Sequence, residues 1–248
     1  MPSPWYAADG DAPQGEETVA GVKGKSILVT GASRGLGRAI ALELLRQGAA
    51  VVGTGRDPAA MAETQRQFAA VSGAFTLVSL DCRDEQAVIA CIARMPALHV
   101  VVNNAGISRY RPFLDTPVEE VREILEINVI GAFIVMREAA RRMAREGGGL
   151  IINIASELAL HGSPRLAPYC ASKHALLGLG RAVRQELIDC RVRVTTFCPG
   201  PINTEIHGTP QPNPLYMESP DLAATVVHLA GTPEEIDIEE LLVRPSGL

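Results

Sequence analysis

From Lys25 onward the chain alternates short apolar runs with longer amphipathic stretches. The short runs are rich in β-branched residues, which is typical of strands, and the longer stretches repeat apolar residues with the period of a helix. The expected strands span residues 26–30, 50–54, 75–80, 99–103, 150–155, 193–198 and 238–243. The expected helices span residues 36–47, 59–70, 84–95, 118–145, 167–189 and 221–230. The pattern therefore predicts seven strands and six helices.

Several of the expected strands are continuously apolar, for example 27–29 and 100–102. Strands of this kind are buried on both faces, as in a parallel sheet that helices cover on each side. The predicted fold is α/β: a doubly wound, seven-stranded parallel sheet of the Rossmann type in a single domain, residues 24–248. Ligands of such sheets bind beyond the carboxyl ends of the strands, so we expect the loops after the strands to carry the function.

Composition narrows the class of protein. The chain has 248 residues, of which 47% are hydrophobic, enough for one large domain. Its formal charge is −5 and it contains no basic block, which argues against nucleic acid and anionic membrane surfaces as partners. No apolar stretch approaches the ~20 residues of a membrane span, and the first residues lack the layout of a secretion signal. Residues 1–23, rich in Pro, Gly, Asp and Glu, are expected to form a poorly ordered arm.

The cysteines indicate a reducing compartment, so we expect a cytoplasmic protein. Their number is odd and their spacing fits neither a disulfide framework nor a zinc site, so no metal is expected. Cys170 could be a reactive thiol or a small buried hydrophobic residue, and the second interpretation is favoured. The five cysteines are Cys82, Cys91, Cys170, Cys190 and Cys198.

A glycine-rich turn, residues 30–37, joins the first strand to the first helix. Small residues there allow backbone N–H groups to approach a pyrophosphate at the helix N-terminus, and Gly37 allows the helix to pack close to the strand. Taken alone, such a turn is also compatible with a purely steric need for glycine.

Tyr169 and Lys173 lie four residues apart in an expected helix, with Ser156 thirteen residues upstream. Residues at this spacing share a helix face, so an ammonium would lie beside a phenol. A free tyrosine has a pKa of about 10, and bringing it near neutrality requires roughly 4 kcal/mol of phenolate stabilisation. The same spacing also occurs on ordinary amphipathic helices whose lysine extends to solvent.

Six motifs in a fixed order resolve this ambiguity. They are the turn G-x-x-x-G-x-G, the segments 103–106 and 128–131, Ser156, Tyr169-x-x-x-Lys173, and Pro199-Gly200. Over residues 24–245 the chain closely resembles the short-chain dehydrogenase/reductase family.

The resemblance implies a catalytic tetrad of Asn128, Ser156, Tyr169 and Lys173. Tyr169 would be the general acid for carbonyl reduction and the base for alcohol oxidation. Lys173 would lower the pKa of Tyr169 and bind the nicotinamide ribose, Ser156 would orient the substrate oxygen, and Asn128 would hold a water that passes protons to solvent.

The resemblance also implies that NADP(H) is the cofactor. Arg56 stands where NAD-preferring relatives place an acidic residue, and Arg34 adds a second cation for a 2′-phosphate. Asp57 could bind a ribose, but a helix cap before Pro58 is the favoured interpretation. The implied cofactor-binding residues are Gly31, Ser33, Arg34, Gly35, Leu36, Gly37, Arg56, Asp81, Cys82, Asn104, Gly106, Tyr169, Lys173, Pro199, Gly200, Ile202 and Thr204.

Three of these assignments carry further expectations. Asp81 would contact adenine, although it could simply end the third strand. Asn104 and Gly106 would line the adenosine ribose, whereas neighbouring Asn103 is expected to tie the central strands together.

The substrate is expected to be a small carbonyl compound or alcohol. In relatives the pocket is built by the segments corresponding to 157–167 and 205–220, and the second is short here, with His207, Tyr216 and Met217 in it. Arg109 and Arg111 could bind a substrate carboxylate or an acidic carrier protein, although an ordinary solvated surface is favoured.

The expected assembly is a homodimer or homotetramer formed through helices 118–145 and 167–189. One alternative function is a 3-oxoacyl-(acyl carrier protein) reductase. An alternative of another class is a catalytically silent NADP-sensing regulator, which the presence of both Tyr169 and Lys173 disfavours.

Overall fold

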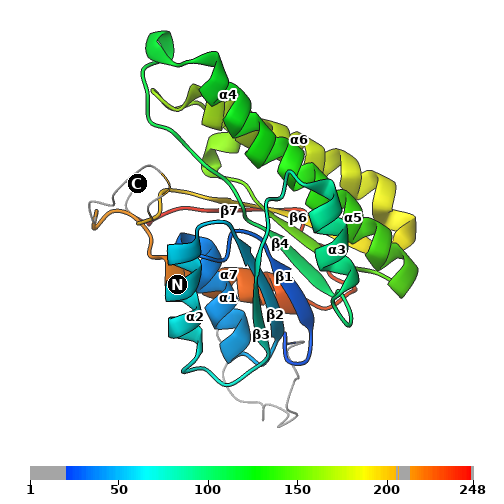
Figure 1. Cartoon of the computed structure of the whole chain (residues 1–248). Coiled ribbons are helices and arrows are strands. Elements are labelled where there is room, and N and C mark those ends of the chain that lie inside the picture. The colour runs from blue at the N-terminus through cyan, green and yellow to red at the C-terminus, as the bar shows by residue number, and fades with distance from the viewer. Residues whose placement is uncertain (1–20, 205, 207–212, 247–248) are drawn as a thin grey trace, which may run out of the picture.

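The computed structural model describes residues 21–204, 206 and 213–246. One parallel sheet of seven strands forms its centre, in the order β3-β2-β1-β4-β5-β6-β7 (Figure 1). The strands are β1 (Ser26–Val29), β2 (Ala50–Gly55), β3 (Phe75–Ser79), β4 (Val100–Asn103), β5 (Gly149–Ile154), β6 (Val192–Pro199) and β7 (Glu240–Val243). The strand order reverses between β1 and β4, which is where sheets of this kind bind ligands.

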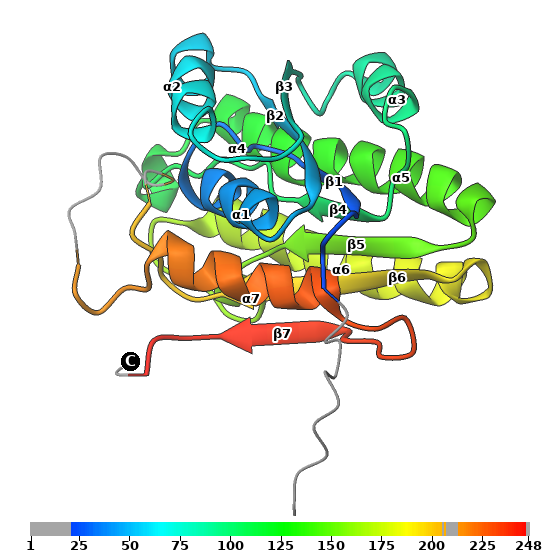
Figure 2. The same cartoon turned by 90° about the horizontal axis from the view of Figure 1, so that it is seen from below.

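Helices cover both faces of the sheet, so the prediction of a doubly wound Rossmann-type α/β fold is confirmed. The α-helices are α1 (Gly35–Arg46), α2 (Pro58–Phe68), α3 (Glu85–Ala93), α4 (Val118–Leu125), α5 (Ala132–Glu146), α6 (Ala167–Leu187) and α7 (Ser219–Gly231). Short 3-10 turns lie at η1 (Phe113–Asp115), η3 (Glu157–Ala159) and η4 (Ile188–Cys190). The two layers lie on opposite sides of the strands in Figures 1 and 2.

Alternate residues of each central strand pack into two separate apolar clusters. Ile27 and Val29 of β1 pack into one cluster with residues of α1 and α7, whereas Leu28 packs into the other with residues of α3, α5 and α6. All residues of β1 and β4 are buried. Burial on both faces explains why these strands are continuously apolar in sequence.

One predicted helix is wrong in detail. The stretch expected as a single helix over 118–145 consists of α4, a π-helical segment η2 (Glu126–Gly131) and α5, so the described residues contain seven α-helices instead of six. A π-helical segment widens the helix locally and is frequent at functional sites. Asn128 lies in this segment and is 1% exposed.

The domain begins slightly earlier than expected. Val22 is buried in the same apolar cluster as Ile27 and Leu44, although it falls within the segment 1–23 expected to be an arm. Residues 1–20 of that expected arm lie outside the described residues. In the part of the chain that the structure describes, no helix combines the length and apolar character needed to cross a bilayer.

Candidate active site

The glycine-rich turn presents the N-terminus of α1 at the carboxyl edge of the sheet. Gly31 has φ of +67° and Gly35 has φ of +53°, a region that glycine adopts without strain. Arg34 is the N-cap residue and no side chain caps the helix. Because the first N–H groups of a helix have no partner within it, this end is suited to bind an anion.

Gly37 and Asn104 hold the turn against the neighbouring strand. A Cβ on Gly37 would overlap the side-chain nitrogen of Asn104 and the carbonyl oxygen of Gly31. Asn104 Nδ2 donates to the carbonyl oxygens of Thr30 (2.9 Å) and Gly31 (3.3 Å). The amide of Asn104, expected to line a ribose, is thus used to join the loops after β1 and β4.

Asn103 ties the central strands together, as expected. Its Nδ2 donates to Asn153 Oδ1 of β5 (3.2 Å) and to the carbonyl oxygen of Ala132 (2.9 Å). The loop after β4 continues to Gly106, where an added Cβ would lie 3.2 Å from Asn128 Oδ1. A side chain at position 106 would therefore require the amide of Asn128 to shift slightly.

The carbonyl oxygen of Ser33 is held by two residues that sequence reasoning missed. Thr64 Oγ1 donates to it at 2.8 Å, and Arg38 donates through Nη2 at 2.6 Å and Nε at 3.2 Å. Gly55, at the end of β2, lets Ser33 approach closely, since a Cβ there would lie 2.7 Å from the Ser33 Cβ. These contacts hold the middle of the glycine-rich turn against α2 and β2. The glycine motif does not indicate the role of Thr64, because Thr64 belongs to α2.

Three arginines and two carboxylates follow the carboxyl ends of β1, β2 and β3: Arg34, Arg56, Arg83, Asp57 and Asp81. Arg56 Nη1 and Arg83 Nη2 contact Asp81 Oδ2 at 3.0 and 2.6 Å. Hydrogen bonds from Arg83, opposed by burial and helped by Arg56, hold the pKa of the Asp81 carboxyl well below its usual range. Asp81, expected to contact adenine or end a strand, is therefore engaged by arginines, and Arg83 was missed by sequence reasoning.

Asp57 caps α2, which confirms the favoured interpretation. Its Oδ1 accepts a hydrogen bond from the backbone N–H of Ala60 at 2.9 Å, with Pro58 in the first turn. Nearby Cys82 is 7% exposed, and burial raises the pKa of its thiol to about 12. Its side chain packs beside Gly131 of the π-helical segment.

Tyr169, Lys173 and Ser156 come together at the carboxyl ends of β5 and β6. Tyr169 and Lys173 lie on one face of α6, with Lys173 Nζ 5.5 Å from the centroid of the tyrosine ring. Lys173 Nζ also donates to the carbonyl oxygen of Ile154 at 2.7 Å. A side-chain hydrogen bond joins Tyr169 to Ser156, whose Oγ also accepts from the N–H of Leu158 at 3.2 Å.

Burial shifts the two ionisable groups of this cluster in opposite directions. It raises the pKa of Tyr169, and the hydrogen bond with Ser156 opposes that rise. Burial lowers the pKa of Lys173 to about 8. Desolvation of the phenol is the largest influence on its pKa here, and Lys173 Nζ lies over the face of the ring. That Lys173 lowers the pKa of Tyr169 stays a prediction.

Asn128 positions the loop after β4 and the first turn of α6. Its Nδ2 donates to the carbonyl oxygen of Ile107 (2.9 Å) and to Ser172 Oγ (3.0 Å), and its Oδ1 accepts from the N–H of Ile107 (2.8 Å). Ser172 is fully buried, and its Oγ in turn donates a hydrogen bond to the carbonyl oxygen of Tyr169 at 2.7 Å. The role of Ser172 was missed, because its type alone gives no signal.

Contacts tie the segment after β6 to β7 and to the N-terminus of α1. The N–H of Gly200 donates to the carbonyl oxygen of Val243 at 2.7 Å, which continues the pairing of Pro199 with β7. Ile202 forms a parallel bridge with Met217. The side chain of Thr204 lies in contact distance of the Cβ position of Gly35. The segment therefore leads from the sheet to the N-terminus of α1.

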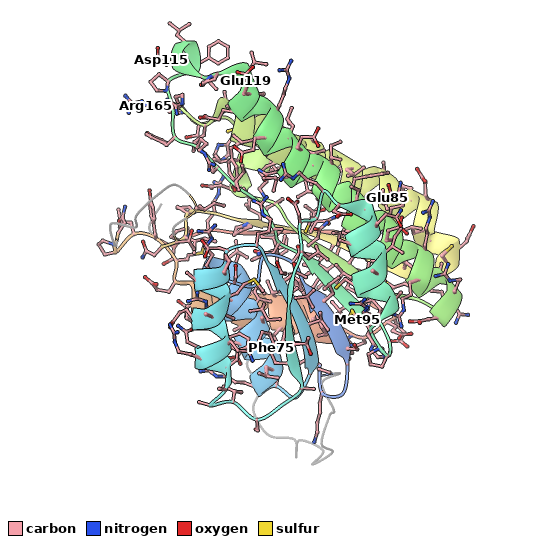
Figure 3. All side chains as sticks on the ribbon, in the orientation of Figure 1. Phe75, Glu85, Met95, Asp115, Glu119 and Arg165 are labelled. Atoms are coloured by element: carbon pink, nitrogen blue, oxygen red, sulfur yellow. The ribbon has the colours of Figure 1, made fainter. Side chains whose placement is uncertain are left out.

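A tip formed by η1, the start of α4 and the segment around Arg165 projects beyond the sheet (Figure 1). Asp115, Glu119 and Arg165 mark it in Figure 3. Of the two expected substrate segments, 157–167 contributes to this tip, where the carbonyl oxygen of Arg165 accepts a hydrogen bond from the N–H of Arg111 at 2.9 Å. Arg109 and Arg111 are ion-paired there with Glu123 (3.6 Å) and Glu120 (3.0 Å). These pairs support the solvated-surface interpretation of the two arginines.

The segment 205–220 was expected to contribute three side chains to the substrate pocket. Tyr216 and Met217 lie among the described residues, whereas His207 lies outside them. Across the described ranges, no cluster of His, Cys, Asp and Glu side chains has the arrangement of a metal site.

The chain belongs to the short-chain dehydrogenase/reductase family. A family model described as short chain dehydrogenase matches residues 25–214. Members of this family use nicotinamide cofactors.

Three similar proteins illustrate the range of the family. The probable oxidoreductase EphD of Mycobacterium bovis is 36% identical over 214 residues, which cover 84% of this chain and 34% of that protein. The chain thus spans about a third of the length of that relative. An alcohol dehydrogenase of Thermococcus sibiricus complexed with 5-hydroxy-NADP has a TM-score of 0.81 and 26% identity, covering 91% of this chain and 98% of the other. A short chain dehydrogenase of Mycobacterium paratuberculosis bound to NAD has a TM-score of 0.82 and 28% identity, covering 90% and 97%.

Proposed function

We propose that the protein is an NADP(H)-dependent oxidoreductase that interconverts a small carbonyl compound and a secondary alcohol. The observation that carries this proposal is the buried cluster of Tyr169, Lys173 and Ser156 at the same carboxyl edge of the sheet as the uncapped N-terminus of α1. An acid that can protonate a carbonyl oxygen and a site suited to a pyrophosphate thus share one edge of the sheet.

The residues present fit a dinucleotide. Gly31 could not carry a side chain, because its Cβ would lie 2.9 Å from the Cα of Ala105, and Gly35 leaves the helix end open. The turn from Gly31 to Gly37 would hold the pyrophosphate. Arg34 and Arg56 would hold a 2′-phosphate, which arginine binds through charge-assisted hydrogen bonds. The remaining expected contacts, from Asp81 to Thr204, lie along the same edge of the sheet.

The cofactor supplies the hydride, and this chain supplies orientation and the proton. In the direction of reduction, the hydroxyl of Tyr169 gives its proton to the substrate oxygen as the carbonyl carbon receives the hydride. Ser156 orients that oxygen through its hydroxyl. Lys173 is held by Ile154 beneath the tyrosine ring, and Asn128 fixes the turn of α6 that carries Tyr169.

A panel assay tests the proposal. NADPH and NADH are each offered with small ketones, β-keto acids and acyl thioesters, and loss of absorbance is followed. We expect turnover of at least one small carbonyl compound with a preference for NADPH. Turnover of acyl thioesters alone would favour the 3-oxoacyl reductase alternative. Binding of NADPH without any turnover would favour the silent regulator. Arg56→Ala should raise the KM for NADPH selectively.

A further inference from the structure

The carboxylate of Asp81 is shared unequally between two arginines. Arg83 binds it through Nη2 at 2.6 Å, through Nε at 3.1 Å, and through its backbone N–H at 3.0 Å. Arg56 provides one hydrogen bond, from Nη1 at 3.0 Å. Arg83 alone therefore satisfies both oxygens of Asp81.

Arg56 is consequently only loosely engaged. Its side chain is 47% exposed, and its other guanidinium N–H groups have no partner among residues 21–204, 206 and 213–246. The pKa of Asp81 is held low mainly by Arg83, with Arg56 a smaller contributor. Giving up the contact with Asp81 would cost Arg56 little, because partly exposed ion pairs are weak.

Arg83 offsets the charge of one of the two carboxylates near Arg56. Arg34, Arg56 and Arg83 lie near the carboxylates of Asp57 and Asp81, and Arg34 is close enough to Asp57 to lower the pKa of its carboxyl. Asp57 is already committed to the N-terminus of α2. Without Arg83, Asp81 would have Arg56 as its arginine partner.

We propose that Arg83 determines cofactor choice as a positioning residue: it occupies Asp81 and so leaves Arg56 available to a phosphate on the 2′ position of the adenosine ribose. This inference rests on the proposed use of NADP(H). It concerns binding of the cofactor and requires no contact between Arg83 and the cofactor.

Direct binding tests the inference. The dissociation constants of NADPH and NADH are measured by fluorescence titration of the full chain without substrate, and their ratio, Kd(NADH)/Kd(NADPH), is compared among variants. We expect Arg83→Ala to lower the ratio by about threefold to tenfold, the scale of a weak ion pair acting on one phosphate contact. Arg83→Lys should restore part of the loss, because it keeps the charge without the paired donors.

A second substitution separates positioning from simple loss of charge. In the double variant Arg83→Ala with Asp81→Asn, Arg56 has no carboxylate to bind, so the ratio should return to within twofold of the wild-type value or exceed it. Any contact of Asp81 with adenine would affect both cofactors alike and cancel in the ratio. The control is Arg145→Ala, an exposed arginine in the last turn of α5, which should leave the ratio unchanged.

The outcomes distinguish the two proposals. If Arg56→Ala lowers the ratio but Arg83→Ala does not, or weakens both cofactors equally, the role of Arg83 is overturned while the NADP(H) preference stands. If the double variant stays as low as Arg83→Ala, competition by Asp81 is overturned. If the wild type binds NADH as tightly as NADPH, the NADP(H) preference itself fails and the inference fails with it.

Discussion

Lys173 Nζ lies 5.5 Å from the centroid of the Tyr169 ring and donates a hydrogen bond to the carbonyl oxygen of Ile154 at 2.7 Å. Both side chains are buried, so desolvation stabilises the neutral phenol and the neutral amine. At neutral pH, Tyr169 therefore holds its proton. In the proposed reaction this state is the one needed to protonate a carbonyl oxygen.

The buried lysine should give the stability of the protein a distinct pH dependence. Its pKa is about 8 in the folded chain and 10.5 in the reference state, so the unfolded state binds more protons between these values. Relative to Lys173→Met, the free energy of unfolding of the wild type should therefore rise by about 1 to 2 kcal/mol from pH 8 to 9.5. Buried thiols with raised pKa values, such as Cys82, act in the opposite direction, but they do so equally in both proteins and cancel in the comparison. Urea unfolding of the two proteins at several pH values measures the difference, and parallel curves would contradict the assignment.

Gly37 should tolerate no side chain. In Gly37→Ala the added Cβ meets Asn104 and the carbonyl oxygen of Gly31, so we expect a loss of about 1 to 3 kcal/mol in the free energy of unfolding. Weaker NADPH binding should accompany it, because the turn must move. Gly178→Ala is the matched control: it lies on an exposed part of α6 with no atom near the Cβ position. This change should be neutral or stabilise by up to about 1 kcal/mol, and equal losses in the two variants would refute the prediction.

Ser172 should affect catalysis through the position of Tyr169. Ser172→Ala removes the link between Asn128 and the carbonyl oxygen of Tyr169. We expect kcat to fall by about tenfold to a hundredfold, the usual scale for a slightly misplaced catalytic group, with the Kd for NADPH within threefold of wild type. Steady-state kinetics and fluorescence titration measure the two quantities. Ser72→Ala, an exposed serine before β3, serves as the control, and an unchanged kcat in Ser172→Ala would exclude this role.

The cysteines should differ in reactivity. Cys82, Cys91, Cys170 and Cys198 are buried, whereas Cys190 is partly exposed. Because burial protects a thiol and disfavours the thiolate, an alkylating agent should modify the native protein mainly at Cys190, with little change in activity. Peptide mass mapping after brief alkylation identifies the site. Rapid modification of Cys170 with parallel loss of activity would show that it is the reactive thiol considered from the sequence.

The parts of the structure that depend on local pattern could be predicted from the sequence. Continuous apolar runs gave the buried central strands, and Asp57 followed by Pro58 indicated the start of α2. The need for glycine at position 37 followed from its place in the turn. In each case the relevant neighbours lie within a few residues or belong to one repeating element.

Other features depend on tertiary contacts that no local pattern encodes. Thr64 reaches Ser33 across 31 residues, and Arg56 reaches Asp81 across 25. The π-helical segment around Asn128 has the same apolar pattern as the helices beside it, so periodicity could not reveal it. The direction of the Tyr169 pKa shift depends on burial, which the spacing of Tyr169 and Lys173 does not specify.

Assembly into a homodimer or homotetramer stays a prediction. Ile130, Phe133 and Ile188 are partly exposed on the helical layer that was expected to form the interface. Sedimentation of the purified chain measures its state directly, and a monomer at micromolar concentration would contradict the prediction.

The central claim is that Tyr169 supplies the proton, and Tyr169→Phe tests it most directly. The substitution removes one hydroxyl while keeping the buried ring, so the fold and the turn around α1 should persist. NADPH oxidation with the best carbonyl substrate is measured alongside the Kd for NADPH by fluorescence titration. The account predicts a loss of turnover of at least about a hundredfold with a Kd within threefold of wild type. A variant that reduces the substrate at the wild-type rate would contradict the account.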